Sequence, residues 1–281
     1  MVGPPGAGKS TLARELAVQG FTYINQDAQG REHLSMFDEA ILAGENVVVD
    51  RLNFTKNQRA RYIDVAKNHG YTSKIVVLHQ PYQICLERCI NRKDHETIKA
   101  EVAAKSALNM FFSKYERVED NEADVVGRLW PEGHKPIAVI CDLDGTLCKI
   151  NHRLHFVKRP KGERKDWKGF FDGMIDDQVN SWCADILYRY NDFKIILCSG
   201  RPDSYRRDTV EWLEKNSIGY DELFMRNRAD HRQDNIAKEI ILDFEILTRY
   251  TPFFMIDDRS QVVEMWRKRG YTCLQCASGD F

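Results

Sequence analysis

Several features are missing from this sequence of 281 residues, and each absence excludes a class of protein. No apolar run approaches the ~18 residues that a membrane-spanning helix needs, and we recognise no signal or transit segment. With 41 basic and 42 acidic residues there is no charge excess, which excludes a uniformly basic nucleic-acid coat. The eight cysteines are scattered. Without a secretion signal they predict reduced cytoplasmic thiols rather than a disulfide framework.

The sequence does contain enough apolar residues for a core, with 43% hydrophobic and 11% aromatic residues. Short β-branched runs alternate with amphipathic stretches, and this order predicts an α/β protein with parallel sheets covered on both faces. The predicted strands are 21–25, 46–50, 74–79, 137–141, 194–198, 222–225, 252–256 and 272–276. Prolines and a glycine interrupt the pattern at Trp130–Pro136. We therefore predict two domains in series, residues 1–130 and 137–281.

The first chemical motif lies at the beginning of the chain, where residues 3–10 fit the pattern G-x-x-x-x-G-K-[ST] before a predicted helix. Its glycines let backbone N–H groups surround phosphate oxygens, its lysine reaches the β- and γ-phosphates, and its serine holds Mg²⁺. The motif and the helix together favour a nucleotide site over a glycine-rich surface turn. The candidate residues are Gly3, Gly6, Gly8, Lys9, Ser10 and Thr11.

One element expected of such a domain is absent from the pattern. A phosphate-binding loop normally follows a buried strand of ~5–6 residues, but only Met1 and Val2 precede this loop. We expect that the first strand is missing or vestigial, and truncation is the favoured explanation.

Four further residues could complete a phosphotransferase site. Asp27 follows a predicted strand and is the candidate general base, with a helix cap as its alternative role. Asp50 also ends a strand; it could orient Ser10 or a metal-bound water, or simply form a turn. Arg88 and Arg92 lie four residues apart on one helical face and could close over a triphosphate, or could belong to a solvated basic face.

A second constellation begins where the buried strand 137–141 ends. Period-two alternation predicts that Asp142 and Asp144 leave the strand on the same side, and two such close carboxylates imply bound Mg²⁺. Asp142 could attack phosphorus as a nucleophile. Asp144 could protonate the leaving group and then activate water.

Later segments supply complementary groups. Ser199–Arg201 follows a strand and could bind phosphate oxygens, and Lys238 on an amphipathic helix could bridge nucleophile and phosphate. Asp257 and Asp258 end another strand and are further candidate metal ligands. Each group alone also fits a surface or turn position, but the complete set predicts a phosphatase.

Together these motifs resemble the phage-type bifunctional polynucleotide 5′-kinase/3′-phosphatase family. The resemblance covers nearly the whole chain and is most specific from Ile256 to Trp266 and from Ala277 to Phe281. It implies a P-loop NTPase-like kinase followed by a haloacid-dehalogenase-like (HAD-like, Rossmannoid) phosphatase. It also implies ATP as phosphoryl donor, Mg²⁺, and RNA or DNA ends as substrates, in the host cytoplasm if a phage encodes the chain. Homo-oligomer formation is a further implication of the resemblance.

The resemblance assigns the same roles as the motifs: Lys9 and Ser10 to ATP, Asp27 to the acceptor hydroxyl, and Asp142 and Asp144 to phosphate removal. Two positions depart from the family pattern. Gly30 stands where the family has a phosphate-contacting arginine, so that the neighbouring Arg31 is expected to take this role. Gln26 often corresponds to arginine, which would change the preferred acceptor end.

A basic segment supports nucleic acid independently of the resemblance. Between Lys149 and Lys168 there are eight Lys or Arg against two acidic residues, with Phe156 and Trp167 interleaved. This composition suits phosphate contacts and base stacking, although a solvated loop has the same composition. Two alternatives to an end-repair enzyme stay open: a metabolite kinase fused to a small-molecule phosphatase, and a protein whose kinase half is inactive. The sequence does not distinguish RNA from DNA.

Overall fold

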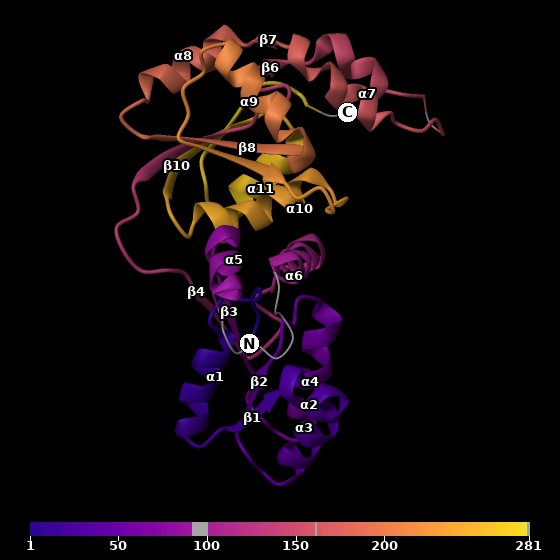
Figure 1. Ribbon diagram of the computed structural model, residues 1–281, viewed down its shortest axis with the longest axis vertical. Coiled ribbons are helices and arrows are strands. Elements are labelled where there is room, and N and C mark those ends of the chain that lie inside the picture. The colour runs from indigo at the N-terminus through magenta and orange to yellow at the C-terminus, as the bar shows by residue number, and fades with distance from the viewer. Residues whose placement is uncertain (92–100, 161, 280–281) are drawn as a thin grey trace. The chain divides into compact units, whose positions relative to one another are not determined.

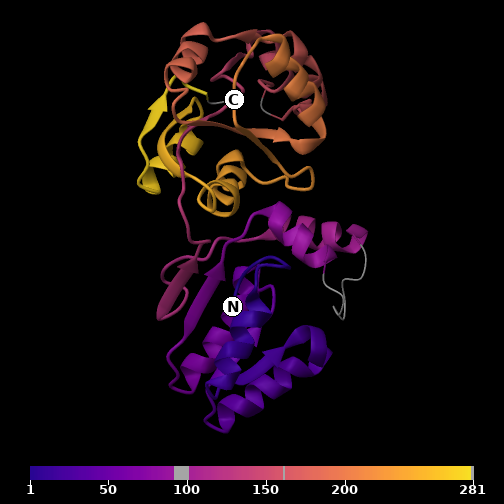
Figure 2. The same cartoon turned by 60° about the vertical axis from the view of Figure 1, so that its left-hand side comes forward.

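The computed structural model describes residues 1–91, 101–160 and 162–279, which form two compact units, Met1–Glu132 and Gly133–Phe281 (Figures 1 and 2). Both are α/β units with parallel strand pairing. Among the described residues, no helix combines the length and apolar character needed to cross a membrane.

The first unit contains two parallel strand pairs. Strands β1 and β2 pair from Thr22 opposite Val47 to Asn25 opposite Asp50, and β3 pairs with β4. The strands are β1 (Thr22–Asn25), β2 (Val47–Asp50), β3 (Lys74–Leu78) and β4 (Val125–Leu129). The helices are α1 (Lys9–Val18), α2 (Gln26–Gln29), α3 (His33–Leu42), α4 (Lys56–Asn68), α5 (Tyr82–Ile90) and α6 (Glu101–Lys114), with the 3₁₀ turn η1 (Gly30–Glu32).

The position expected for a first strand is occupied by a single residue. Val2 forms a parallel bridge to Val77, with its N–H donating to the Val76 carbonyl and its carbonyl accepting from the Leu78 N–H, both at 2.9 Å. Strand β4 was not predicted, because Gly127 and Arg128 interrupt its apolar run.

The second unit has a five-stranded parallel sheet in the order β11-β10-β5-β8-β9. The strands are β5 (Ile137–Cys141), β8 (Lys194–Pro202), β9 (Glu222–Arg226), β10 (Thr251–Asp257) and β11 (Cys273–Gln275). The helices packed on it are α8 (Ser181–Arg189), α9 (Arg206–Lys215), α10 (Asp234–Ile241) and α11 (Ser260–Lys268). The sequence pattern predicts one helix over residues 234–247, but α10 ends at Ile241 and the hydrogen bonding changes there to the π-helical turn η5 (Leu242–Ile246).

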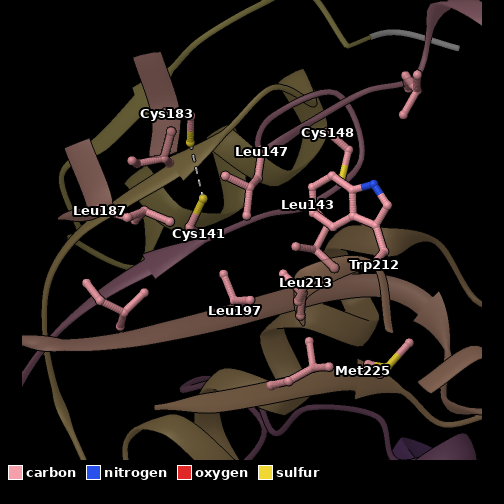
Figure 3. Packing of buried hydrophobic residues seen from close by; sticks show 14 of the residues in the cluster. Cys141, Leu143, Leu147, Cys148, Cys183, Leu187, Leu197, Trp212, Leu213 and Met225 are labelled. Atoms are coloured by element: carbon pink, nitrogen blue, oxygen red, sulfur yellow. Dashed lines mark hydrogen bonds between the residues drawn. The ribbon is translucent and has the colours of Figure 1, made fainter. Parts of the chain in front are cut away.

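Alternating strand residues divide the core of this sheet into two layers. Cys141 and Leu197 point to the layer formed with Trp212 of α9 and Cys183 of α8, which Figure 3 shows. The opposite layer contains Trp266 of α11. The sequence pattern predicts a helix at residues 261–269 that covers the sheet, and this is confirmed, since the apolar face of α11 packs against the sheet.

Between β5 and α8 the chain forms a small cap over the end of the sheet. We define the cap as residues 148–179; its elements are β6 (Cys148–Lys149), η2 (Asn151–Phe156), α7 (Trp167–Asp172), η3 (Gly173–Asp176) and β7 (Gln178–Val179). Strands β6 and β7 pair in antiparallel orientation. The basic segment therefore contains the 3₁₀ helix η2 and the beginning of α7, with residues 157–160 and 162–166 in irregular structure.

Candidate functional site

The first candidate site is a cavity of about 450 Å³ beside the glycine-rich loop. Six predicted residues line it: Gly6, Gly8, Lys9, Ser10, Asp27 and Asp50. Lys9 donates to the carbonyls of Gly3 and Pro4 at 2.9 and 2.8 Å, so its ammonium group lies inside its own loop. The structure thus brings the loop, the candidate base and the candidate metal-orienting acid to one cavity.

Backbone geometry explains why the loop needs glycine at position 6. Gly6 has φ +82°, and a Cβ added there would lie 2.5 Å from the Cys85 carbonyl oxygen. The loop therefore packs directly on α5, whose Arg88 donates to the Gly6 carbonyl at 3.3 Å. Arg92, the predicted partner of Arg88, lies outside the described residues.

The carboxylates of this cavity are held differently. Asp50 is buried and accepts from the Tyr23 hydroxyl at 2.8 Å and from Asn25 at 3.3 Å. Asp27 is exposed, and Asn25 caps α2 by accepting from the Asp27 N–H at 2.7 Å. The alternative that Asp27 caps the helix is therefore wrong.

Four of the described predicted residues do not line this cavity: Gly3, Thr11, Arg31 and Arg88. Arg31 is exposed in η1, so its predicted contact with a phosphate stays a prediction. Sequence reasoning missed Arg51 and the wall from α6, which includes Ser106 and Met110. Nothing in the local pattern of α6 indicates this contact, because it arises from tertiary packing.

The second candidate site is built around a buried lysine. The Lys238 ammonium group donates to Asp142 Oδ1 at 2.6 Å and to Asp257 Oδ2 at 2.8 Å. Burial alone would lower the pKa of Lys238, but Asp142 and Asp257 outweigh burial and raise it well above its usual range. Lys238 is therefore a permanent cation that joins the ends of β5 and β10.

Carboxylate charge in this cluster exceeds the charge of the lysine. Asp142, Asp257 and Asp258 are buried with carboxylate oxygens within 4.8 Å of one another. Burial raises the pKa of all three, and for Asp258 burial together with Asp257 raises it to about 7. Gly145 approaches so closely, at φ +90°, that an added Cβ would lie 2.3 Å from Asp258. A cradle made only of carboxyl oxygens, whose ionised forms need a nearby cation, fits a hard divalent cation.

Asp144 lies apart from this carboxylate cluster. The Arg201 guanidinium group binds it in a bidentate manner, at 2.9 and 2.7 Å, and Arg153 donates to it as well. Burial alone would raise the pKa of Asp144, but Arg201 and Arg153 hold it well below its usual range. Asp144 is not among the carboxylates that cluster with Asp142, and the prediction that these two aspartates bind one metal stays a prediction. Strand β5 ends at Cys141, so that strand alternation no longer governs their side chains.

The remaining predicted phosphate ligands lie on β8, which is longer than the sequence suggests and runs to Pro202. Gly200 lines the cavity above Asp142, whereas Ser199 is buried and its hydroxyl accepts from the Arg201 N–H at 3.2 Å. The roles predicted for Ser199, Gly200 and Arg201 stay predictions.

Several charged residues around this site were not singled out from the sequence. Asp177 accepts from Arg153 at 2.7 Å, and Asp234 pairs with Arg226 at 3.0 Å and lies 3.7 Å from Lys238. Asp234 could have been found, because it lies four residues before Lys238 on one helical face. Arg153 carried no distinguishing signal, since it is one of eight basic residues in the segment.

The fold and the sites define the class: a P-loop nucleotide-binding unit followed by a HAD-like unit. The family model "Polynucleotide kinase PNKP phosphatase domain" matches residues 136–281, and the model "AAA domain" matches residues 30–117. The chain belongs to the family of polynucleotide kinase PNKP phosphatase domains. Use of a nucleotide and of a metal follows in general terms from these two domain types.

The chain spans less than a third of the length of two curated relatives that it matches. The chain is 28% identical over 119 residues to the bifunctional polynucleotide phosphatase/kinase of Schizosaccharomyces pombe, covering 41% of this chain and 29% of that protein. It is 28% identical over 132 residues to the transcription factor bHLH140 of Arabidopsis thaliana, covering 43% and 14%. A chain in the solved structure of a Pnkp1/Rnl/Hen1 RNA repair complex is 27% identical, with coverage of 100% and 95% and a TM-score of 0.45.

Proposed function

We propose that this protein repairs nucleic-acid ends: it phosphorylates 5′-hydroxyl ends with ATP and removes phosphate from 3′ ends. The observation that carries this proposal is the Asp142–Lys238–Asp257–Asp258 cluster in a member of the PNKP phosphatase family. The cavity that joins the phosphate loop to Asp27 supports the kinase half. The bifunctional relative in S. pombe supports the combination.

In the phosphatase unit, an Asp142 oxygen attacks the phosphorus and the bond from phosphorus to the 3′ oxygen breaks. Water then cleaves the aspartyl phosphate and releases inorganic phosphate. Lys238 holds Asp142 in place, while Asp257 and Asp258 complete the set that would hold Mg²⁺. Bound Mg²⁺ supplies stabilisation of negative charge on the phosphoryl group. Asp144 is the proposed acid–base residue: it gives a proton to the departing 3′ oxygen and then accepts the proton of the attacking water. Its pairing with Arg201 and Arg153 favours the ionised carboxylate, so both proton transfers require substrate binding to loosen this pairing.

In the kinase unit, Asp27 accepts the proton of the 5′-hydroxyl, whose oxygen attacks the γ-phosphorus of ATP while the bond to the β-phosphate breaks. Lys9 and the N–H groups of the loop bind the ATP phosphates, and Ser10 and Asp50 would hold and orient Mg²⁺. Arg88 lies beside the loop and adds positive charge there.

We further propose that the protein acts in the cytoplasm, because none of its eight cysteines, all of which are described, forms a disulfide. Any homo-oligomer would have to use a surface other than the apolar face of α11, which is buried against the sheet.

The proposal is tested with an oligoribonucleotide that carries a 5′-hydroxyl and a 3′-phosphate, incubated with the protein, ATP and Mg²⁺ and weighed by mass spectrometry. We expect a gain of one phosphate at the 5′ end and loss of the 3′-phosphate. Comparison with a DNA strand of the same sequence shows whether the enzyme prefers RNA or DNA. Loss of the 3′-phosphate alone would mean that the kinase half is inactive. An unchanged oligomer with hydrolysis of simple phosphate esters would favour metabolite chemistry.

The raised pKa of Asp258 predicts a pH dependence for metal binding. In the metal-free protein the native Asp258 holds a proton up to a pH of about 7, whereas an unfolded aspartate releases it near ~4. In EDTA the free energy of unfolding should therefore fall as the pH rises from ~5 to 8, because the native state binds more protons than the unfolded state in this range. Since metal displaces this proton, apparent affinity for Mg²⁺ should be about tenfold lower at pH 6 than at pH 8.

Thermal melts with and without Mg²⁺ at these two pH values measure this effect. Mg²⁺ should raise the melting temperature more at pH 8, and Asp258→Asn should remove most of the difference. Equal shifts at both pH values in the unmodified protein would contradict the assignment of Asp258 to the metal cluster.

A further inference from the structure

The cavity above Asp142 is larger than a phosphate group requires. It has a volume of about 640 Å³, which lies in the range of ~300–1,000 Å³ typical of pockets that enclose a whole small ligand. Asp142 and Gly200 form part of its lining, and other residues form two walls on either side of them. One wall comes from the cap, and the other from residues 226–233 between β9 and α10. The space between these walls is available to the part of the substrate that carries the phosphate.

The cap wall presents an aromatic side chain in a fixed position. Trp167 lines the cavity and is 42% exposed, although its ring lies 5.9 Å from those of both Phe170 and Phe171. Phe171 in turn lies 5.2 Å from the ring of Tyr205, which lines the same cavity. Asp166 caps α7 by accepting from the Gly169 N–H at 2.9 Å, which fixes the beginning of this helix. A large, partly exposed indole on such a support offers a stacking surface to a planar ligand.

A positively charged side chain, that of Lys165, lies next to the exposed ring of Trp167. The Lys165 ammonium group lies 5.5 Å from the centre of the Trp167 ring and forms no ion pair with any described residue. On the opposite wall Arg228 is exposed and forms an ion pair with Asp203 at 3.0 Å. A planar surface with a cation beside it matches a nucleotide base followed by a backbone phosphate, whereas a simple phosphate ester would use neither.

We propose that Trp167 stacks on the 3′-terminal base of the polynucleotide substrate and that Lys165 binds the phosphate on the 5′ side of that nucleotide. This inference rests on the proposed 3′-phosphatase activity and identifies the residues that make it selective for polynucleotides. Trp167 is a specificity-determining residue rather than a catalytic one, because Asp142 alone attacks the phosphorus.

The test compares the release of phosphate from three substrates. They are a single-stranded oligonucleotide with a 3′-terminal base and 3′-phosphate, the same strand with an abasic 3′-terminal nucleotide, and glycerol 2-phosphate. Trp167→Ala should lower kcat/KM about tenfold on the first substrate, within the range measured for single base–aromatic stacks. It should leave the other two substrates nearly unchanged, and Trp167→Phe should restore most of the loss.

Lys165→Ala should lower kcat/KM on both oligonucleotides but not on glycerol 2-phosphate. It should also reduce the slope of log kcat/KM against log salt concentration on the oligonucleotides by about the amount that one phosphate contact contributes. Trp182→Ala and Lys215→Ala are the matched controls. Trp182 is also 42% exposed, and both residues lie on helices of the same unit outside the cavity lining.

The outcomes separate the inference from the function beneath it. An equal loss on all three substrates in Trp167→Ala and Trp167→Phe would mean that the tryptophan only supports the cap, and no loss on any substrate would exclude stacking. Either result overturns the inference while the phosphatase activity stands. Failure of the unmodified protein on all three substrates would overturn the proposed function itself.

Discussion

Replacement of Asp142 by asparagine should abolish the release of 3′-phosphate while 5′-phosphorylation continues. The amide has nearly the same shape as the carboxylate but cannot form the aspartyl phosphate, so the two-step route is lost. Deletion of a nucleophile in other hydrolases lowers kcat by about 10⁴–10⁶-fold, and a loss of at least ~10⁴-fold is expected here. The measurement is single-turnover release of phosphate from a 3′-phosphorylated oligonucleotide.

The control for Asp142→Asn is Asp185→Asn, at an exposed position of α8 away from the cavity. Asp185→Asn should keep the unmodified rate. Because Lys238 keeps its contact with Asp257, the Asp142→Asn protein should also keep its fold, which a thermal melt can verify. A rate within tenfold of the unmodified protein would exclude Asp142 as the nucleophile.

Replacement of Lys9 by alanine should have the opposite effect, loss of 5′-phosphorylation with normal phosphate release. Lys9 is a buried cation of the phosphate loop that lines the cavity, and without it the loop loses a positive charge that would stabilise the transferred phosphoryl group. Removal of one stabilising donor typically costs about 10²–10³-fold in kcat, and a charged donor should reach the upper end. Transfer of radioactive phosphate from ATP to a 5′-hydroxyl oligonucleotide measures this loss.

Lys56→Ala serves as the matched control, because Lys56 is exposed on α4 of the same unit and does not line the cavity. The two main variants also control each other. Each should lose one activity and keep the other, since the two sites lie in separate compact units. Loss of both activities in either variant would refute the model of two independent sites.

Local sequence patterns were sufficient for most of the secondary structure. The sequence pattern predicts a strand at 137–141 and a helix at 56–68, and both have these bounds in the structure, because apolar runs and capping residues act within a few positions of the chain. At Thr55 a complete capping box begins α4, and the residues that form it lie within four positions. The errors occur where local rules stop: β4 contains a glycine, and the end of α10 changes to a π-helical turn.

The candidate site was only partly predictable, and Asp144 shows why. The motif Asp142-x-Asp144 indicated a carboxylate pair, and the chain does belong to the family of polynucleotide kinase PNKP phosphatase domains. The cation that pairs with each carboxylate comes from a segment far away in sequence. Asp142 pairs with Lys238, 96 positions later, while Asp144 pairs with Arg201, 57 positions later. Burial then gives these pairs their strength, and burial is a property of the packed sheet.

The sequence by itself determined the two α/β units, the glycine-rich loop and the types of chemical group available at the strand ends. Each of these follows from spacing along the chain and from the chemistry of single residues. Only the tertiary structure decided that Lys238 pairs with both Asp142 and Asp257, that Arg153 belongs to the site, and that Trp167 lines the cavity above it. The physical reason is that charge pairing and cavity shape are set by distances between segments, which the order of residues does not contain.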